Sequence, residues 1–135
     1  MYNEDIELAK SARLKAHSPY SNFQVGAVLR TKTGKLYSGC NIENHGIQGI
    51  CAERTAFAKA LSEGEREFER ITIVGSIKGE EPKEKCMPCG YCRQFMSEFV
   101  KDDFKICVVD KDENIQELTI NELLPHSFKF WALNW

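Results

Sequence analysis

Residues 51–56 read Cys-Ala-Glu-Arg-Thr-Ala, and residues 88–94 read Pro-Cys-Gly-Tyr-Cys-Arg-Gln. Each run stands where the pattern predicts that a helix begins. A helix N-terminus carries partial positive charge, so it favours the thiolate that a metal ion needs. Cys89 and Cys92 are three positions apart and are expected on the same side of one helical turn. The spacing therefore allows one cation to bind both sulfurs.

A third sulfur comes from Cys51 if the two helix ends meet. Three protein ligands leave a fourth position open, which is typical of catalytic rather than structural zinc. Glu53 lies two residues after Cys51, and inside a regular helix the two side chains would point apart. The pair can work together if Cys51 is the N-cap residue with non-helical backbone angles. Zinc lowers the pKa of water to about 7, and the Glu53 carboxylate can then pass a proton from that water to a substrate.

Arg54 can offset the excess negative charge of this site. Three thiolates outweigh the charge of Zn²⁺, which leaves a negative centre that is a poor Lewis acid. Arg54 follows Cys51 by three residues and is expected on the ligand side of that helix. Our hypothesis is that Arg54 donates to the cysteine sulfurs and withdraws charge from them.

Length and composition predict one domain that covers residues 1–135, in which 42% of the residues are hydrophobic. The net charge of −2 argues against a nucleic-acid partner and fits a small, weakly charged substrate. The sequence shows neither an apolar stretch long enough for a membrane span nor a secretory leader, so we expect a cytoplasmic protein without a membrane partner.

Hydrophobic periodicity and turn residues predict alternating helices and strands after an initial helix and hairpin, and this order indicates a layered α/β domain with a mixed sheet. The first helix is expected to end at Pro19. The expected helices cover residues 4–17, 51–63, 89–100 and 121–124, and the expected strands cover residues 23–31, 36–41, 70–77, 104–109 and 115–118.

The chain resembles the cytidine deaminase family, in particular its small homotetrameric branch, over nearly its whole length. The resemblance is carried by residues 19–27 (Pro-Tyr-Ser-Asn-Phe-Gln-Val-Gly-Ala), 39–44 (Gly-Cys-Asn-Ile-Glu-Asn), 51–56 and 123–125 (Leu-Leu-Pro), with the second cysteine run. It implies a three-layer α/β/α fold with a mixed five-stranded sheet and one zinc ion per subunit. It also implies hydrolysis of cytidine and deoxycytidine to uridine and deoxyuridine, with release of ammonia, in pyrimidine salvage.

The resemblance also assigns roles to the residues of the two runs. Cys51, Cys89 and Cys92 match the zinc ligands, and Glu53 matches the proton shuttle, a glutamate that is not itself a ligand in zinc deaminases. A cysteine at the first ligand position is similar to the nucleoside branch, because cytidylate and transfer-RNA-editing relatives have histidine there.

Four further residues match positions that contact the substrate in this family. Phe23 is similar to the aromatic residue that packs against the pyrimidine ring, and Asn41 and Glu43 to the pair that hydrogen-bonds the ribose 3′-hydroxyl. Phe128 matches a C-terminal phenylalanine that reaches the site of a neighbouring subunit, so the resemblance implies a site completed by a homotetramer.

One segment departs from the family pattern. The family usually has an Ala-x-Tyr segment after the residues matching Glu43-Asn44, whereas residues 45–50 here read His-Gly-Ile-Gln-Gly-Ile, one residue shorter and without the tyrosine. That loop contributes to a sugar pocket in the family. The change keeps open an alternative substrate, a modified cytosine nucleoside such as blasticidin S, whose deaminases share the two cysteine runs.

Cys86 allows two other interpretations of the cysteines. Cys86, Cys89 and Cys92 form a C-x₂-C-x₂-C run that resembles an iron–sulfur segment, although Met96 stands where a fourth cysteine would be expected. Alternatively, Cys86 joins the other three sulfurs in a closed four-cysteine zinc site, and the protein is a structural binding module rather than an enzyme.

Overall fold

The computed structural model describes residues 2–130. Within that range, no helix combines the length and the apolar character needed to cross a membrane. The helices are α1 (Asn3–Arg13), α2 (Ala52–Ser62), α3 (Gly90–Ser97) and α4 (Ile120–Leu123), and the strands are β1 (Phe23–Thr31), β2 (Leu36–Cys40), β3 (Phe68–Ile77), β4 (Lys105–Val109) and β5 (Ile115–Leu118).

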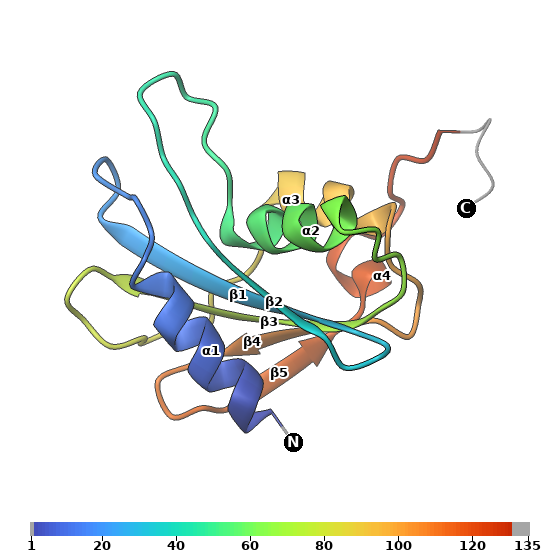
Figure 1. Ribbon diagram of the computed structural model, residues 1–135, viewed down its shortest axis with the longest axis horizontal. Helices are drawn as coiled ribbons and strands as arrows, with labels where there is room; N and C mark the ends of the chain where they lie inside the picture. Colours follow the sequence, from blue (N-terminus) through green and yellow to red (C-terminus); the bar gives the residue numbers. More distant parts are fainter. Residues whose placement is uncertain (1, 131–135) are drawn as a thin grey trace.

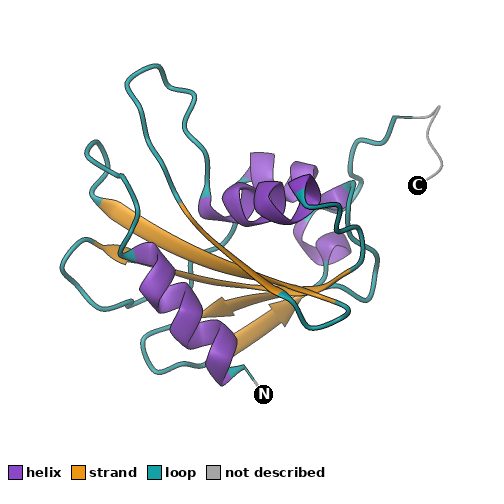
Figure 2. Ribbon diagram, viewed as in Figure 1, coloured by secondary structure: helices purple, strands orange, loops and turns teal. Residues whose placement is uncertain are grey.

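The strands form one mixed sheet in the order β2-β1-β3-β4-β5. β3 and β4 pair in parallel, and the other neighbouring strands pair antiparallel. α1 covers one face of the sheet, and α2 and α3 lie side by side over the other face (Figures 1 and 2). The predicted five-stranded sheet and three-layer α/β/α architecture are therefore confirmed.

β3 is the centre of the core because both of its faces are buried. Ile71 and Ile73 pack into the apolar cluster beneath α2 and α3, whereas Val74 packs into the cluster beneath α1. Phe57 of α2 anchors the larger cluster, and it contacts a group of aromatic rings from Phe68, Phe95, Phe99 and Phe104. This packing fixes α2 on the sheet.

The first helix ends earlier than the sequence predicted, at Arg13 rather than next to Pro19, so that boundary was wrong. The backbone N–H groups of residues 14–16 donate to carbonyls three residues back, which tightens the chain into a turn. His17 then forms a β-bridge with Ile42. This long-range pairing redirects the chain before the proline is reached.

Gly39 of β2 lets the start of α2 approach the sheet closely. A Cβ atom at Gly39 would lie 2.6 Å from both the Ala52 carbonyl oxygen and the Ala56 nitrogen, which are backbone atoms that have little freedom to move. Any larger residue would therefore push α2 away. Because Cys51 and Glu53 stand at this end of α2, Gly39 sets their height above the sheet.

Candidate active site

Two cysteines occupy the N-cap positions of neighbouring helices. Cys51 caps α2 with φ −78° and ψ 157°, and Cys89 caps α3 with φ −70° and ψ 168°. Neither thiol caps its own helix by a side-chain hydrogen bond. The extended backbone at Cys51 is the condition under which Cys51 and Glu53 can serve one site. The N-terminal ends of α2 and α3 thus direct sulfurs toward one point.

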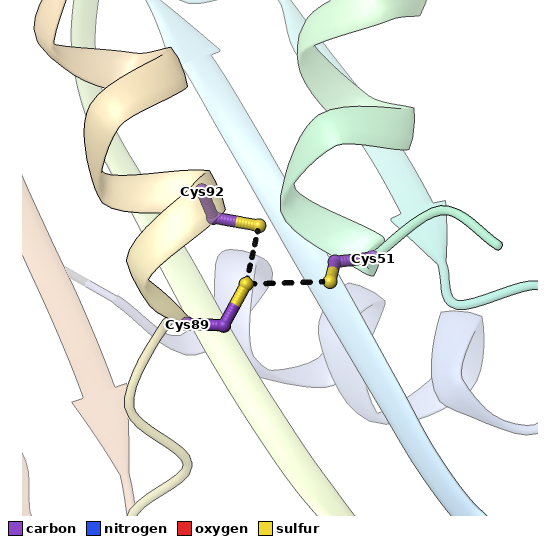
Figure 3. Close-up of side chains that lie close together, drawn as sticks. All are labelled: Cys51, Cys89 and Cys92. Carbon is purple, nitrogen blue, oxygen red and sulfur yellow. Dashed lines mark hydrogen bonds between the residues drawn. The ribbon is translucent and has the colours of Figure 1, made fainter. Parts of the chain in front are cut away.

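The sulfurs of Cys51, Cys89 and Cys92 meet between these helix ends (Figure 3). The Cys89 sulfur lies 3.7 Å from the Cys51 sulfur and 3.5 Å from the Cys92 sulfur. All three sulfurs lie within 4.8 Å of one another. A tetrahedral zinc ion with Zn–S bonds of about 2.3 Å places its sulfurs about 3.8 Å apart. The three side chains therefore fit one zinc ion with a position left for a fourth ligand.

Arg54 supplies positive charge to this cluster. Its Nη2 donates to the Cys51 sulfur over 3.6 Å, and its guanidinium lies 4.0 Å from the centre of the Tyr91 ring. The pKa of Cys51 is lowered because the Cys92 thiol and the Arg54 guanidinium both donate to its sulfur. Arg54 thus lies where it can withdraw charge from a ligand.

Glu53 lies inside the first turn of α2 with only 4% of its surface exposed. Burial raises the pKa of its carboxyl to about 7, and the nearby Cys51 charge adds to this effect. A carboxyl group with such a pKa can both accept and donate a proton near neutral pH. This environment suits a proton-transferring group rather than a surface carboxylate.

Asn41 and Glu43 hold the chain that leads into β1. The Asn41 side chain accepts from the Val25 nitrogen over 2.8 Å and donates to the Phe23 oxygen over 2.9 Å. The Glu43 carboxylate accepts from the backbone nitrogens of Tyr20 and Ser21 and from the Ser21 hydroxyl. The Asn41 amide keeps a second N–H and the carboxylate keeps free lone pairs, so both can still bind a ligand.

The loop of residues 44–50 projects away from the sheet between β2 and α2 (Figure 1). With Tyr20 and Glu43 it lines a surface depression. Ile47 at its tip is 95% exposed and has φ 55°, a left-handed conformation that is strained for a β-branched residue. The segment that departs from the family pattern thus lies directly beside Glu43.

Phe128 lies beyond α4 with 70% of its surface exposed. Its carbonyl oxygen accepts a hydrogen bond from the Gln94 side chain of α3 over 3.0 Å. Tyr91, also on α3, is 65% exposed. Two large aromatic side chains, Tyr91 and Phe128, are thus largely exposed in this chain.

Cys86 stands outside the sulfur cluster, which among the described residues comprises three cysteines. The closed four-cysteine site and the iron–sulfur segment are therefore not favoured. Cys86 instead lies next to Gly75 and Phe23, and burial raises the pKa of its thiol to about 12. Sequence reasoning did not foresee this contact, although an isolated glycine in a strand of β-branched residues is a signal of close approach.

The comparisons with known proteins agree with this geometry. Residues 2–108 match the family model described as the cytidine and deoxycytidylate deaminase zinc-binding region. A cytidine deaminase of Halalkalibacterium halodurans is 46% identical over 131 residues, which cover 96% of this chain and 95% of that protein. A cytidine deaminase of Sporosarcina psychrophila is 41% identical over 124 residues, covering 91% of this chain and 88% of that protein.

A crystal structure of cytidine deaminase from Burkholderia pseudomallei superposes with a TM-score of 0.84 at 41% sequence identity. The match covers 95% of this chain and 99% of that one. Similarity in both sequence and fold extends over nearly the whole chain, including both cysteine-bearing helix ends. This chain therefore belongs to the zinc-dependent cytidine deaminase family.

Proposed function

We propose that this protein is a hydrolase that deaminates cytidine and deoxycytidine to uridine and deoxyuridine and releases ammonia. The observation that carries the proposal is the convergence of three cysteine sulfurs at two helix ends beside the buried carboxyl of Glu53. A closed structural site would use a fourth protein ligand, and a structural site needs no buried carboxyl group beside it.

In this proposal Cys51, Cys89 and Cys92 hold one zinc ion per subunit, which supplies Lewis-acid activation of water. Glu53 takes a proton from the water that attacks C4 of the cytosine ring. The same carboxyl group gives this proton to the ring nitrogen. It then moves the remaining proton of the hydroxyl group added at C4 to the amino group, so that the C4–N bond breaks, a C4 carbonyl forms and ammonia leaves. Arg54 withdraws charge from the sulfurs.

The remaining roles concern the substrate. Phe23 packs against the pyrimidine ring, and Asn41 and Glu43 bind the ribose 3′-hydroxyl. Both polar side chains are held in place by bonds to the chain around β1, so they are pre-organised for a ligand. Phe128 reaches the site of a neighbouring subunit.

We further propose that residues 1–135 form one domain that assembles as a homotetramer in the cytoplasm and serves pyrimidine salvage. The exposed rings of Tyr91 and Phe128 support assembly, because aromatic residues are enriched at protein interfaces. A reducing compartment is favoured because the three clustered thiols must stay unoxidised to bind metal.

The substrate assignment is tested by ammonia release from cytidine, deoxycytidine, CMP and blasticidin S, with one preparation and equal enzyme concentrations. Cytidine and deoxycytidine are expected to react fastest, because the Glu43 carboxylate disfavours a phosphate near the sugar. Faster turnover of CMP than of cytidine would overturn the assignment. Turnover of blasticidin S alone would favour the modified-nucleoside alternative.

A further inference from the structure

Gly75 lies on the face of the sheet that carries the sulfur cluster. Gly75 follows Ile71 and Ile73 at two-residue spacing along β3, so all three positions face the same side of the sheet. Ile71 and Ile73 pack beneath α2 and α3. It pairs with Val25 of β1, whereas Phe23 pairs with Ile77. Gly75 therefore adjoins Phe23 diagonally on the same face, where a large side chain reaches across.

The space above Gly75 is filled by two side chains from other elements. A Cβ atom at Gly75 would lie 2.9 Å from the Cys86 sulfur and 2.9 Å from Cε2 of Phe23. Distances under 3.0 Å are shorter than van der Waals contact, so the ring and the sulfur occupy the volume that a methyl group would need. The absence of a side chain at Gly75 is thus a condition for the present position of the Phe23 ring.

Cys86 links the contact of Gly75 with the Phe23 ring to the metal centre. It precedes the proposed ligand Cys89 by three residues and packs against the same apolar cluster as Cys51. The backbone of Phe23 is fixed independently, because its nitrogen binds the Ser21 hydroxyl and its oxygen binds the Asn41 amide. Those bonds leave the plane of the ring to be set by what the ring touches.

We propose that Gly75 and Cys86 are positioning residues that set the plane of the Phe23 ring relative to the metal centre. The inference rests on the proposed function, in which Phe23 packs against the base. Neither residue belongs to the sulfur cluster, so their effect on the reaction passes through the ring. Their influence should appear in substrate binding rather than in metal binding.

A cavity of about 230 Å³ makes this inference testable without unfolding the protein. Phe23, Gly75 and Cys86 line it together with residues from the 76–85 segment. A ring displaced by a methyl group at Gly75 can therefore move into existing space. The displacement costs less than crowding inside a closed core would.

The test compares steady-state cytidine kinetics and zinc content of the parent, Gly75→Ala, Cys86→Ala and the double variant. Gly75→Ala is expected to raise KM about tenfold with kcat and zinc content near the parent values. Cys86→Ala should raise KM less. The double variant should recover most of the loss, because the sulfur that opposes the new methyl group has been removed.

An unchanged KM for Gly75→Ala would overturn the proposal, as would a double variant whose KM change is the product of the two single changes. If Gly75→Ala fails to fold, Cys86→Leu replaces it in the test. The larger Leu side chain crowds the Phe23 ring without altering β3, and it should also raise KM. An unchanged KM for Cys86→Leu would overturn the proposal in that case.

Cys107→Ala is the matched control, because it truncates a buried thiol on β4 that lies outside the cluster, and its KM should equal that of the parent. A crystal structure of Gly75→Ala separates this inference from the proposed function. A displaced Phe23 ring supports the positioning role even if cytidine proves not to be the substrate. An undisplaced ring contradicts it.

Discussion

Glu53→Gln is expected to lower kcat by about a thousandfold or more, because general acid–base catalysis is lost with the carboxyl group. Gln has nearly the same shape and fits the buried position, but it can neither accept nor release a proton. Zinc content should remain at one ion per chain, since Glu53 contributes no atom to the sulfur cluster. The expected result is a folded, zinc-loaded protein without turnover, measured by ammonia release and metal analysis.

Glu63→Gln is the matched control for this experiment. Glu63 is the C-cap residue of the same helix, and its side chain is largely exposed and binds Lys35 and Tyr37. The control should keep parental kcat and zinc content. If Glu53→Gln retained parental turnover, Glu53 would be removed from its proposed role. If it lost zinc instead, Glu53 would belong to the metal-binding set.

Cys89→Ala is expected to reduce bound zinc to a small fraction of one ion per chain and to abolish turnover. The Cys89 sulfur lies close to both of the others, at 3.7 Å from the Cys51 sulfur and 3.5 Å from the Cys92 sulfur, so its removal leaves two of the three sulfurs. Two ligands hold zinc far less strongly than three. Inductively coupled plasma analysis after gel filtration measures the loss directly.

Cys40→Ala provides the control for this substitution. Cys40 is a half-buried cysteine at the end of β2, outside the sulfur cluster, and its replacement should leave zinc content and turnover unchanged. Full zinc loading of Cys89→Ala would show that the metal binds elsewhere and would end the assignment of these ligands.

The strands could be predicted well because their evidence is local. The predicted strand of residues 23–31 coincides with β1, since the Lys32–Lys35 turn marks its end in the sequence. The first helix could not be bounded in the same way. Its end depends on the bridge between His17 and Ile42, a pairing between residues far apart in the chain.

The sulfur cluster could be anticipated because it depends on spacing within helix starts. Cys89 and Cys92 share one turn, and Cys51 opens a helix that a compact domain can bring alongside. The contact of Gly75, Cys86 and Phe23 beside this cluster could not be anticipated. The meeting of Gly75, Cys86 and Phe23 depends on strand register and on the path of a loop, which no local pattern specifies.

We propose that three cysteine sulfurs bind one zinc ion and leave a face open beside Glu53. X-ray absorption spectroscopy at the zinc edge of the purified, zinc-loaded protein tests it most directly. The expected spectrum shows three sulfur neighbours at about 2.3 Å and one oxygen or nitrogen neighbour at about 2.0 Å. A first shell of four sulfurs, which would bring in Cys86, or of fewer than three, would contradict it.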